Sequence, residues 1–259
     1  MYERTRLVSL RAAADAFGVK AIYLKDESTR FGLKAFKGLG GSYAVFRILC
    51  DTLGLDHRKA VFRDFMTDEN REKCREVVFV TATDGNHGKG VAWASALFGC
   101  KAYVYMPAGS VEARRKAIED AGAESAVIKD LNYDKVVQFA RRQAEENGWT
   151  LIQDTAWEGY EKIPRWIVEG YLTMGAEICE QLDGTVPTHV FLQAGVGAMA
   201  GGIMGYLSNV FAAKEPVFTM VEPSTVACLY ESAKAGDGNI RSIAGDPEGR
   251  SDESRNGNP

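Results

Sequence analysis

The sequence predicts an α/β protein built around a mostly parallel sheet. Short apolar runs alternate with segments of helical periodicity along the 259 residues. Several of the apolar runs are rich in valine, isoleucine and aromatic residues, as buried strands are. Glycine-rich turns follow some of these strands and open the next helix. Strands that alternate with helices form βα units, which place ligands at the carboxyl ends of the strands.

The first half of the chain gives these elements in order. Ser9 is a candidate N-cap for a helix through Ala16 that Gly18 ends. An apolar run and then a helix with small residues in its first turns come next. The charged, weakly periodic stretch 51–75 is read as an excursion or short helix. We expect strands at 21–24, 77–80 and 102–106, and helices at 38–50, 91–97 and 111–121.

The second half continues the alternation and then changes in character. We expect strands at 126–128, 151–152, 189–192 and 217–221, and helices at 133–145, 163–182, from the glycine loop through 210, and near 225–234. From residue 236 onward the chain is almost entirely polar. Residues 246–259 cannot bury enough apolar surface to order themselves, so we expect disorder there.

Composition excludes several classes. Lys+Arg 31 against Asp+Glu 35 gives a net charge of −4, without the basic excess of nucleic-acid binders. The 5 cysteines form no CxxC, which favours a reducing, cytoplasmic setting. No segment approaches the ~20 apolar residues that cross a bilayer, so we expect no membrane association. The 3 histidines lack metal-ligand spacing and no GxSxG occurs, so neither a metal site nor a serine hydrolase is expected.

A lysine-bearing segment, 30–42, is the first candidate for chemistry. Lys37 lies between a phenylalanine and a glycine at a predicted helix start. Partial burial near a positive helix end favours the neutral, nucleophilic amine that carbonyl cofactors require. Lys34 is an equally placed rival on spacing alone, and a solvated surface lysine is the simpler interpretation of either.

A second candidate is the polar turn at 81–90, between a strand and a helix. Such a turn exposes backbone N–H groups at a positive helix end and binds anions such as carboxylates. Asp84, Asn86 and His87 would lie on its rim, and Gly85 permits close approach of a ligand. The alternative is an Asp-Gly turn that only caps the helix.

The third candidate is the glycine loop 193–202, which also joins a strand to a helix. Its geometry is typical of a phosphate cradle. Gly195 and Gly197, followed by Glu222 20 residues after Gly202, also partly imitate a dinucleotide fingerprint. From this segment alone an NAD site, or glycines needed only for packing, remain open. In the segment 154–160, Asp154 at a strand end is either catalytic or a helix cap beside packed aromatic residues.

Together these segments resemble the fold-type II pyridoxal-phosphate enzymes, and in particular the diaminopropionate ammonia-lyases. The resemblance rests on residues 25–37, 82–93, 153–160 and 193–202 and covers about residues 2–235. It implies a fold like that of the tryptophan synthase β chain, with two open, twisted, mostly parallel sheets flanked by helices. It implies a small domain at 38–145 and a large cofactor-binding domain made of 1–37 and 146–259.

The resemblance also implies an activity in amino-acid catabolism. Pyridoxal 5′-phosphate would support α,β-elimination of 2,3-diaminopropionate, as either enantiomer, to pyruvate and ammonia. Lys37 would form the Schiff base and serve as base for the L-substrate, and Asp84 would serve the D-substrate. Asp154 would face the active site. Thr83, Gly85 and His87, with their neighbours, would hold the substrate carboxylate.

The remaining implied residues bind the cofactor. Asn86 would bond its phenolic oxygen. The phosphate cradle would consist of Gly195, Val196, Gly197, Ala198, Met199 and Gly201. The family implies a homodimer, and its members run beyond residue 259, so we expect the later strands of the large domain to be missing from this chain.

Three functional hypotheses follow. The first is a diaminopropionate ammonia-lyase. The second is a related serine or threonine dehydratase-like lyase, against which Asp84 and the segment 154–160 argue. The third is a chain without this activity, either an inactive truncated remnant or a Rossmann-type NAD binder. The NAD hypothesis gives no role to Lys37.

Overall fold

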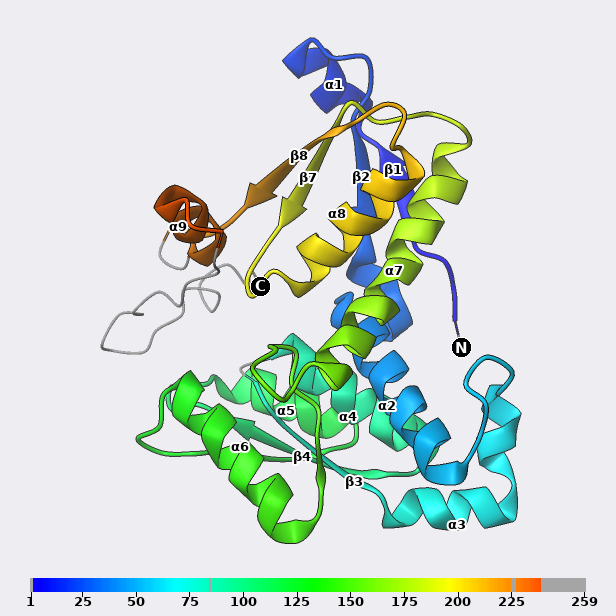
Figure 1. Ribbon diagram of the computed structural model, residues 1–259, viewed down its shortest axis with the longest axis vertical. Helices are drawn as coiled ribbons and strands as arrows, with labels where there is room; N and C mark the ends of the chain where they lie inside the picture. The colour runs from blue at the N-terminus through cyan, green and yellow to red at the C-terminus, as the bar shows by residue number, and fades with distance from the viewer. Residues whose placement is uncertain (1, 84, 225–226, 239–259) are drawn as a thin grey trace. The chain divides into compact units, whose positions relative to one another are not determined.

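The computed structural model describes residues 2–83, 85–224 and 227–238 (Figure 1). The chain divides at Thr185 into two compact units, each described here by itself. Both units alternate strands with helices, so the predicted α/β class is confirmed. The predicted disorder of 246–259 lies outside the described residues. No helix of the described ranges is both long enough and apolar enough to span a membrane.

The first unit begins with a strand pair of which only the second strand was predicted, at 21–24. Strand β1 (Arg6–Ser9) pairs antiparallel with β2 (Tyr23–Asp26), and α1 (Arg11–Phe17) connects them. Ser9 is paired with Tyr23 in this ladder. Leu10 therefore occupies the N-cap position that was predicted for Ser9, while Gly18 ends the helix in the left-handed conformation, as expected.

A four-stranded parallel sheet forms the centre of the first unit. Its order is β5-β4-β3-β6, from β3 (Val78–Ala82), β4 (Lys101–Met106), β5 (Glu124–Val127) and β6 (Thr150–Leu151). The connecting helices are α4 (Asn86–Phe98), α5 (Glu112–Asp120) and α6 (Tyr133–Asn147). The domain division at residue 145 stays a prediction, although this sheet continues to Leu151.

The two faces of this sheet carry different helices. Val80 and Ala82 pack with Val136 and Ala140 of α6 in one buried cluster, and Tyr103 packs against it. The next residue, Val104, points to the opposite face because side chains alternate along a strand. There it lies within 2.8 Å of where a Cβ on Gly88 of α4 would stand. Helices α6 and α4 thus cover opposite faces.

Helix α2 (Lys37–Leu53) packs against both α4 and α7 (Lys162–Leu182). Glycines make these contacts close. A Cβ on Gly41 would lie 3.0 Å from the backbone of Gly90, and one on Gly170 would lie 2.5 Å from the carbonyl oxygen of Leu39. The start of α2 is therefore held by backbone-to-backbone contact on two sides. The charged stretch before β3 contains η2 (Phe62–Met66) and α3 (Asp68–Glu76).

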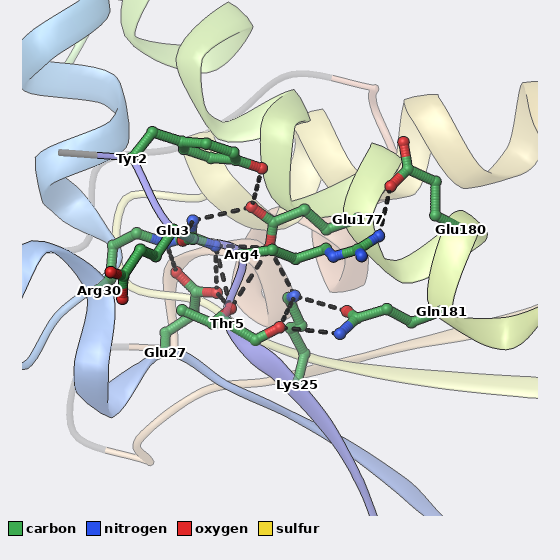
Figure 2. A network of polar contacts seen from close by, with 10 residues as sticks. All are labelled: Tyr2, Glu3, Arg4, Thr5, Lys25, Glu27, Arg30, Glu177, Glu180 and Gln181. Carbon is green, nitrogen blue, oxygen red and sulfur yellow. Dashed lines mark hydrogen bonds and ion pairs between the residues drawn. The ribbon is translucent and has the colours of Figure 1, made fainter.

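A buried ionic network ties the N-terminal strands to α7 (Figure 2). Arg30, in η1 (Glu27–Gly32), is fully buried and donates both terminal nitrogens to the Glu177 carboxylate at 2.8 Å. Glu27, Thr5 and the backbone carbonyl of Glu3 accept its remaining bonds, and Lys25 also donates to Glu177. Burial raises the pKa of Glu177, but these hydrogen bonds outweigh it and lower the pKa to about 2.

Within its described residues, the second unit contains a parallel strand pair and two helices. Its elements are β7 (His189–Gln193), α8 (Ala198–Val210), β8 (Val217–Val221) and α9 (Cys228–Ala235). Strand β7 pairs with β8 in register from His189 opposite Val217 to Gln193 opposite Val221. The bounds of β8 are those predicted, because five consecutive strand-forming residues directly precede Glu222.

Candidate active site

Lys37 is the first residue of α2 and lies beside a buried carboxylate. Its Nζ donates to Oδ2 of Asp154 at 3.1 Å, and its side chain keeps 29% exposure. Lys34, the rival on spacing, is exposed and has a positive φ of 57°. The two lysines thus differ in environment, and only the position of Lys37 combines partial burial with a helix start.

Asp154 follows β6 and is held by its neighbours on both sides. The Gln153 side chain accepts a bond from the Ala82 N–H at 3.2 Å, which fastens this segment to β3. The Tyr160 hydroxyl donates to the Leu151 carbonyl at 2.9 Å and accepts from the Gln153 N–H at 2.8 Å. The backbone that leads into Asp154 is therefore fixed by three hydrogen bonds.

The carboxyl group of Asp154 is almost fully buried, at 5% exposure. Burial raises its pKa, but the electrostatic interactions with His87 and Lys37 and the Lys37 hydrogen bond outweigh burial. The pKa of Asp154 is lowered to about 2. Asp154 is thus an ionised carboxylate at neutral pH.

His87 also lies beside this carboxylate. It is the second residue of α4, only 2% exposed, and its Nε2 is 2.9 Å from the carbonyl oxygen of Ile152. Its Nδ1 is 3.8 Å from Oδ2 of Asp154. The side chain therefore points into the protein and not onto the rim of the turn.

The turn before α4 presents a short set of N–H donors. Helix α4 begins at Asn86, whose side chain is exposed. The first N–H groups of a helix have no intrahelical acceptor, so those of Asn86 and His87 are suited to an anion. The N–H groups of Thr83 and Gly85 are already used, by the Tyr105 carbonyl and the Thr83 hydroxyl. Asp84 lies outside the described residues.

The glycine loop belongs to the second unit and leads directly into α8. Gly197 adopts the left-handed conformation, with φ of 85°, at the N-cap of this helix. Ala198 and Met199 form its first turn, and Val196 is half exposed. A Cβ on Gly201 would meet nothing within 4 Å. The loop thus presents helix N–H groups beside open space, as an anion site requires.

Glu222 has a local structural role. Its carboxylate accepts from the N–H groups of Leu229 at 2.9 Å and Tyr230 at 2.8 Å, at the start of α9. The acid that imitated a ribose ligand in the sequence therefore caps a helix. This removes the main support for the NAD hypothesis.

A family model described as "Pyridoxal-phosphate dependent enzyme" matches residues 1–253. The chain belongs to this family. This match confirms two expectations from the sequence resemblance: the fold-type II fold and the cofactor pyridoxal 5′-phosphate.

Two curated relatives are diaminopropionate ammonia-lyases. The enzyme of Salmonella typhimurium strain LT2 is 50% identical over 248 residues, and that of Escherichia coli K12 is 46% identical over 254. Each alignment covers 95% of this chain, but only 61% and 60% of the relatives. The chain thus spans about 60% of the length of the curated relatives it matches.

Solved structures give the same relationship. The E. coli diaminopropionate ammonia-lyase in complex with D-serine is 46% identical, with a TM-score of 0.87 over 93% of this chain and 61% of that one. The same enzyme with an aminoacrylate–pyridoxal-phosphate azomethine intermediate gives a TM-score of 0.84 over 93% and 60%, at 47% identity. Tomato threonine deaminase isoform 2 (TM-score 0.72, 21% identity, 94% and 60% covered) shares the fold.

Within this pyridoxal-phosphate family fold, the first unit brings together some of the predicted site residues and not others. Lys37, Asp154 and His87 form one cluster. Asn86 begins the same helix as His87 but has an exposed side chain. The segment 154–160 combines the two roles that its sequence left open: Asp154 faces Lys37, while Trp157 and Tyr160 stack at 4.2 Å.

Tyr171 of α7 belongs to this cluster and was not found from the sequence. It is 1% exposed, and burial together with the nearby Asp154 charge raises its pKa well above the usual value. It therefore lines the site as a neutral phenol. An apolar helix with one tyrosine gives no local signal of such a position.

Proposed function

We propose that this chain carries the catalytic lysine of a pyridoxal-phosphate-dependent ammonia-lyase. The reaction is α,β-elimination of D- and L-2,3-diaminopropionate to pyruvate and ammonia. The observation that carries the proposal is the Lys37–Asp154 pair at the start of α2, in a chain 46–50% identical to diaminopropionate ammonia-lyases. The chain supplies an amine for the cofactor aldehyde and a carboxylate that holds this amine in place.

The donor groups of each unit fit the cofactor's parts. Lys37 offers a partly buried amine, and Asn86 an exposed amide that would bond the phenolic oxygen. In the second unit, the loop from Gly195 to Gly201 offers the N–H groups of α8 to a phosphate. When bound, the cofactor supplies the electron sink that stabilises negative charge at Cα.

The protein's own groups would perform the proton chemistry. Lys37 would take the Cα proton of the L-substrate as a neutral amine. Asp84, outside the described residues, would take that of the D-substrate. The N–H groups at the start of α4 would orient the substrate carboxylate. Asp154 would hold the Lys37 amine in position and would stabilise the protonated, positively charged form of that amine.

The direct test uses the purified chain with added pyridoxal phosphate. Borohydride reduction followed by peptide mass spectrometry should place the cofactor on Lys37, and D- and L-diaminopropionate should release pyruvate. The Lys37→Gln variant should lose both signals, whereas Lys34→Gln should keep them. Cofactor attached to another lysine, or to none in a folded sample, would contradict the proposal.

A second candidate activity is that of a serine or threonine dehydratase. One observation favours it: the chain is 30% identical to a threonine dehydratase of Corynebacterium glutamicum over 166 residues. A panel of L-serine, D-serine, L-threonine and diaminopropionate distinguishes the two. Preference for diaminopropionate by at least tenfold in kcat/KM supports the lyase, and preference for L-threonine supports the dehydratase.

We further propose a cytoplasmic homodimer. All 5 cysteines are free thiols, which suits a reducing compartment. Light scattering after size exclusion should give twice the chain mass. Monomer at micromolar concentration would contradict the dimer, and secretion would contradict the compartment.

A further inference from the structure

The imidazole of His87 has one ring nitrogen whose role the fold leaves open. Nε2 lies 2.9 Å from the Ile152 carbonyl oxygen, which can only accept a hydrogen bond. Nε2 therefore carries a proton. The other nitrogen, Nδ1, is buried and has no hydrogen-bond partner among the described residues. A buried polar atom without a partner is costly and calls for an explanation.

Nδ1 faces the Asp154 carboxylate, 3.8 Å from Oδ2. A shift of less than about 1 Å would bring this pair to hydrogen-bond distance. If Nδ1 is protonated, both ring nitrogens donate, and Asp154 gains a cation. If it is not, a lone pair faces a carboxylate.

Lys37 contacts the same carboxylate oxygen, at 3.1 Å. Asp154 thus has two basic groups against it, one on α2 and one on α4. Lys37 can act as a nucleophile or as a base only after it gives up a proton. At that point a carboxylate with 5% exposure would lose a cation.

We propose that His87 is a positioning residue that becomes doubly protonated when Lys37 loses its charge, so that Asp154 stays ionised throughout. The proton leaves the Lys37 ammonium and one proton is bound at Nδ1 of His87, so the net charge around Asp154 is unchanged. This inference deepens the proposed function and rests on it for its purpose. The coupling itself needs no cofactor.

The other titratable groups of this cluster do not compete for the proton. Tyr171 and Tyr160 feel the Asp154 charge, and burial together with that charge raises the pKa of both phenols. They are neutral at physiological pH. Asp84, next to α4 in the sequence, lies outside the described residues, so an Asp84→Asn variant is included in the test.

The first experiment measures His87 protonation by nitrogen-15 NMR of histidine-labelled protein without cofactor. The chain has 3 histidines, so His57→Gln and His189→Gln leave one signal. In this background Lys37→Gln should raise the ratio of doubly to singly protonated His87 at pH 7 at least about tenfold, because Asp154 loses its other cation and its Oδ2 can then accept a hydrogen bond from protonated Nδ1. Lys34→Gln, the matched control, should leave the ratio unchanged.

Two further variants test the path of the coupling. In Lys37→Gln/Asp154→Asn the rise should vanish, whereas in Lys37→Gln/Asp84→Asn it should persist. An unchanged ratio in Lys37→Gln, or a rise that survives the loss of Asp154, would overturn the inference. These results do not depend on whether the chain binds cofactor.

The second experiment follows borohydride trapping of pyridoxal phosphate on Lys37 as a function of pH. His87→Gln keeps a donor for the Ile152 carbonyl but cannot carry charge. Its trapping profile should shift to higher pH, because Lys37 becomes the sole described cation against Asp154. Equal profiles would overturn the inference. Absence of trapping in the unsubstituted chain would instead refute the proposed function and leave the NMR result to decide the coupling.

Discussion

The carbonyl oxygen of Lys37 lies 2.9 Å from the position that a Cβ atom on Gly90 would occupy. This oxygen belongs to the backbone at the start of α2, so it cannot rotate away as a flexible side chain would. The contact fixes the position of the Lys37 backbone relative to α4. Gly90 thus helps to position the Lys37 amine.

Substituting Gly90→Ala should therefore displace the start of α2. We expect a loss of about 1–3 kcal/mol in the free energy of unfolding, as for other overpacked sites, and weaker trapping of pyridoxal phosphate on Lys37. Urea denaturation measures the first effect and peptide mass spectrometry the second. Gly205→Ala in α8, where nothing lies within 4 Å of the added methyl, should instead gain up to about 1 kcal/mol. Equal outcomes for the two variants would refute this account.

Asp154 should make stability depend on pH in acid. Its pKa is about 2 in the folded protein, below the usual 3.8. The ionised form therefore stabilises the fold fully above about pH 4, and this contribution, about 2 kcal/mol, is lost as the pH falls toward 2. Urea unfolding measured between pH 5 and pH 2 should show that the free energy of unfolding falls less steeply with decreasing pH in Asp154→Asn than in the unsubstituted chain. A parallel pair of curves would mean that the carboxylate is not held ionised.

Glu177→Gln should be strongly destabilising, because it leaves the buried charges of Arg30 and Lys25 undercompensated. We expect about 3 kcal/mol or more. Glu180→Gln on the same helix is the control, since it removes an exposed pair with Arg4 that is worth less than about 1 kcal/mol. Chemical denaturation at pH 7 compares them, and similar losses would show that the network contributes little.

Tyr160→Phe should loosen Asp154 without touching it. The variant loses the hydroxyl that bonds the Leu151 carbonyl and the Gln153 N–H, at a cost of about 1–3 kcal/mol. Pyridoxal phosphate should then be trapped on Lys37 less efficiently. Tyr23→Phe, whose parent side chain is 45% exposed, should change neither quantity. If Tyr160→Phe traps as much pyridoxal phosphate on Lys37 as the unsubstituted chain does, the hydroxyl contributes to stability alone.

The sequence was sufficient for elements with a strong local signal. Strand β8 was predicted with the bounds that it has, and α6 was missed only in its last two residues. Helix α4 begins at Asn86, five residues before the predicted helix segment, because glycines at its start have low helix propensity and hide the periodicity. Strand β1 was missed because it is four residues long and depends on pairing with β2.

The candidate site was predictable as residue types but not as contacts. Both Lys34 and Lys37 met the local criteria, and what separates them is Asp154, 117 residues away from Lys37. His87 was assigned to the rim of a turn, yet its ring faces inward, since the first turn of α4 points it toward Ile152. Local spacing carries no information on such distant partners.

The network of Figure 2 also constrains the order in which the chain can complete its fold during synthesis. Arg30 precedes its partner Glu177 by 147 residues, and Tyr2 precedes it by 175. At ribosomal speeds of about 5–20 residues per second, Arg30 waits roughly 7–30 s for Glu177 to be made. Throughout that interval Arg30 and Lys25 lack the carboxylate with which they pair in the folded chain. The N-terminal strand pair therefore cannot complete its final packing until α7 has been made.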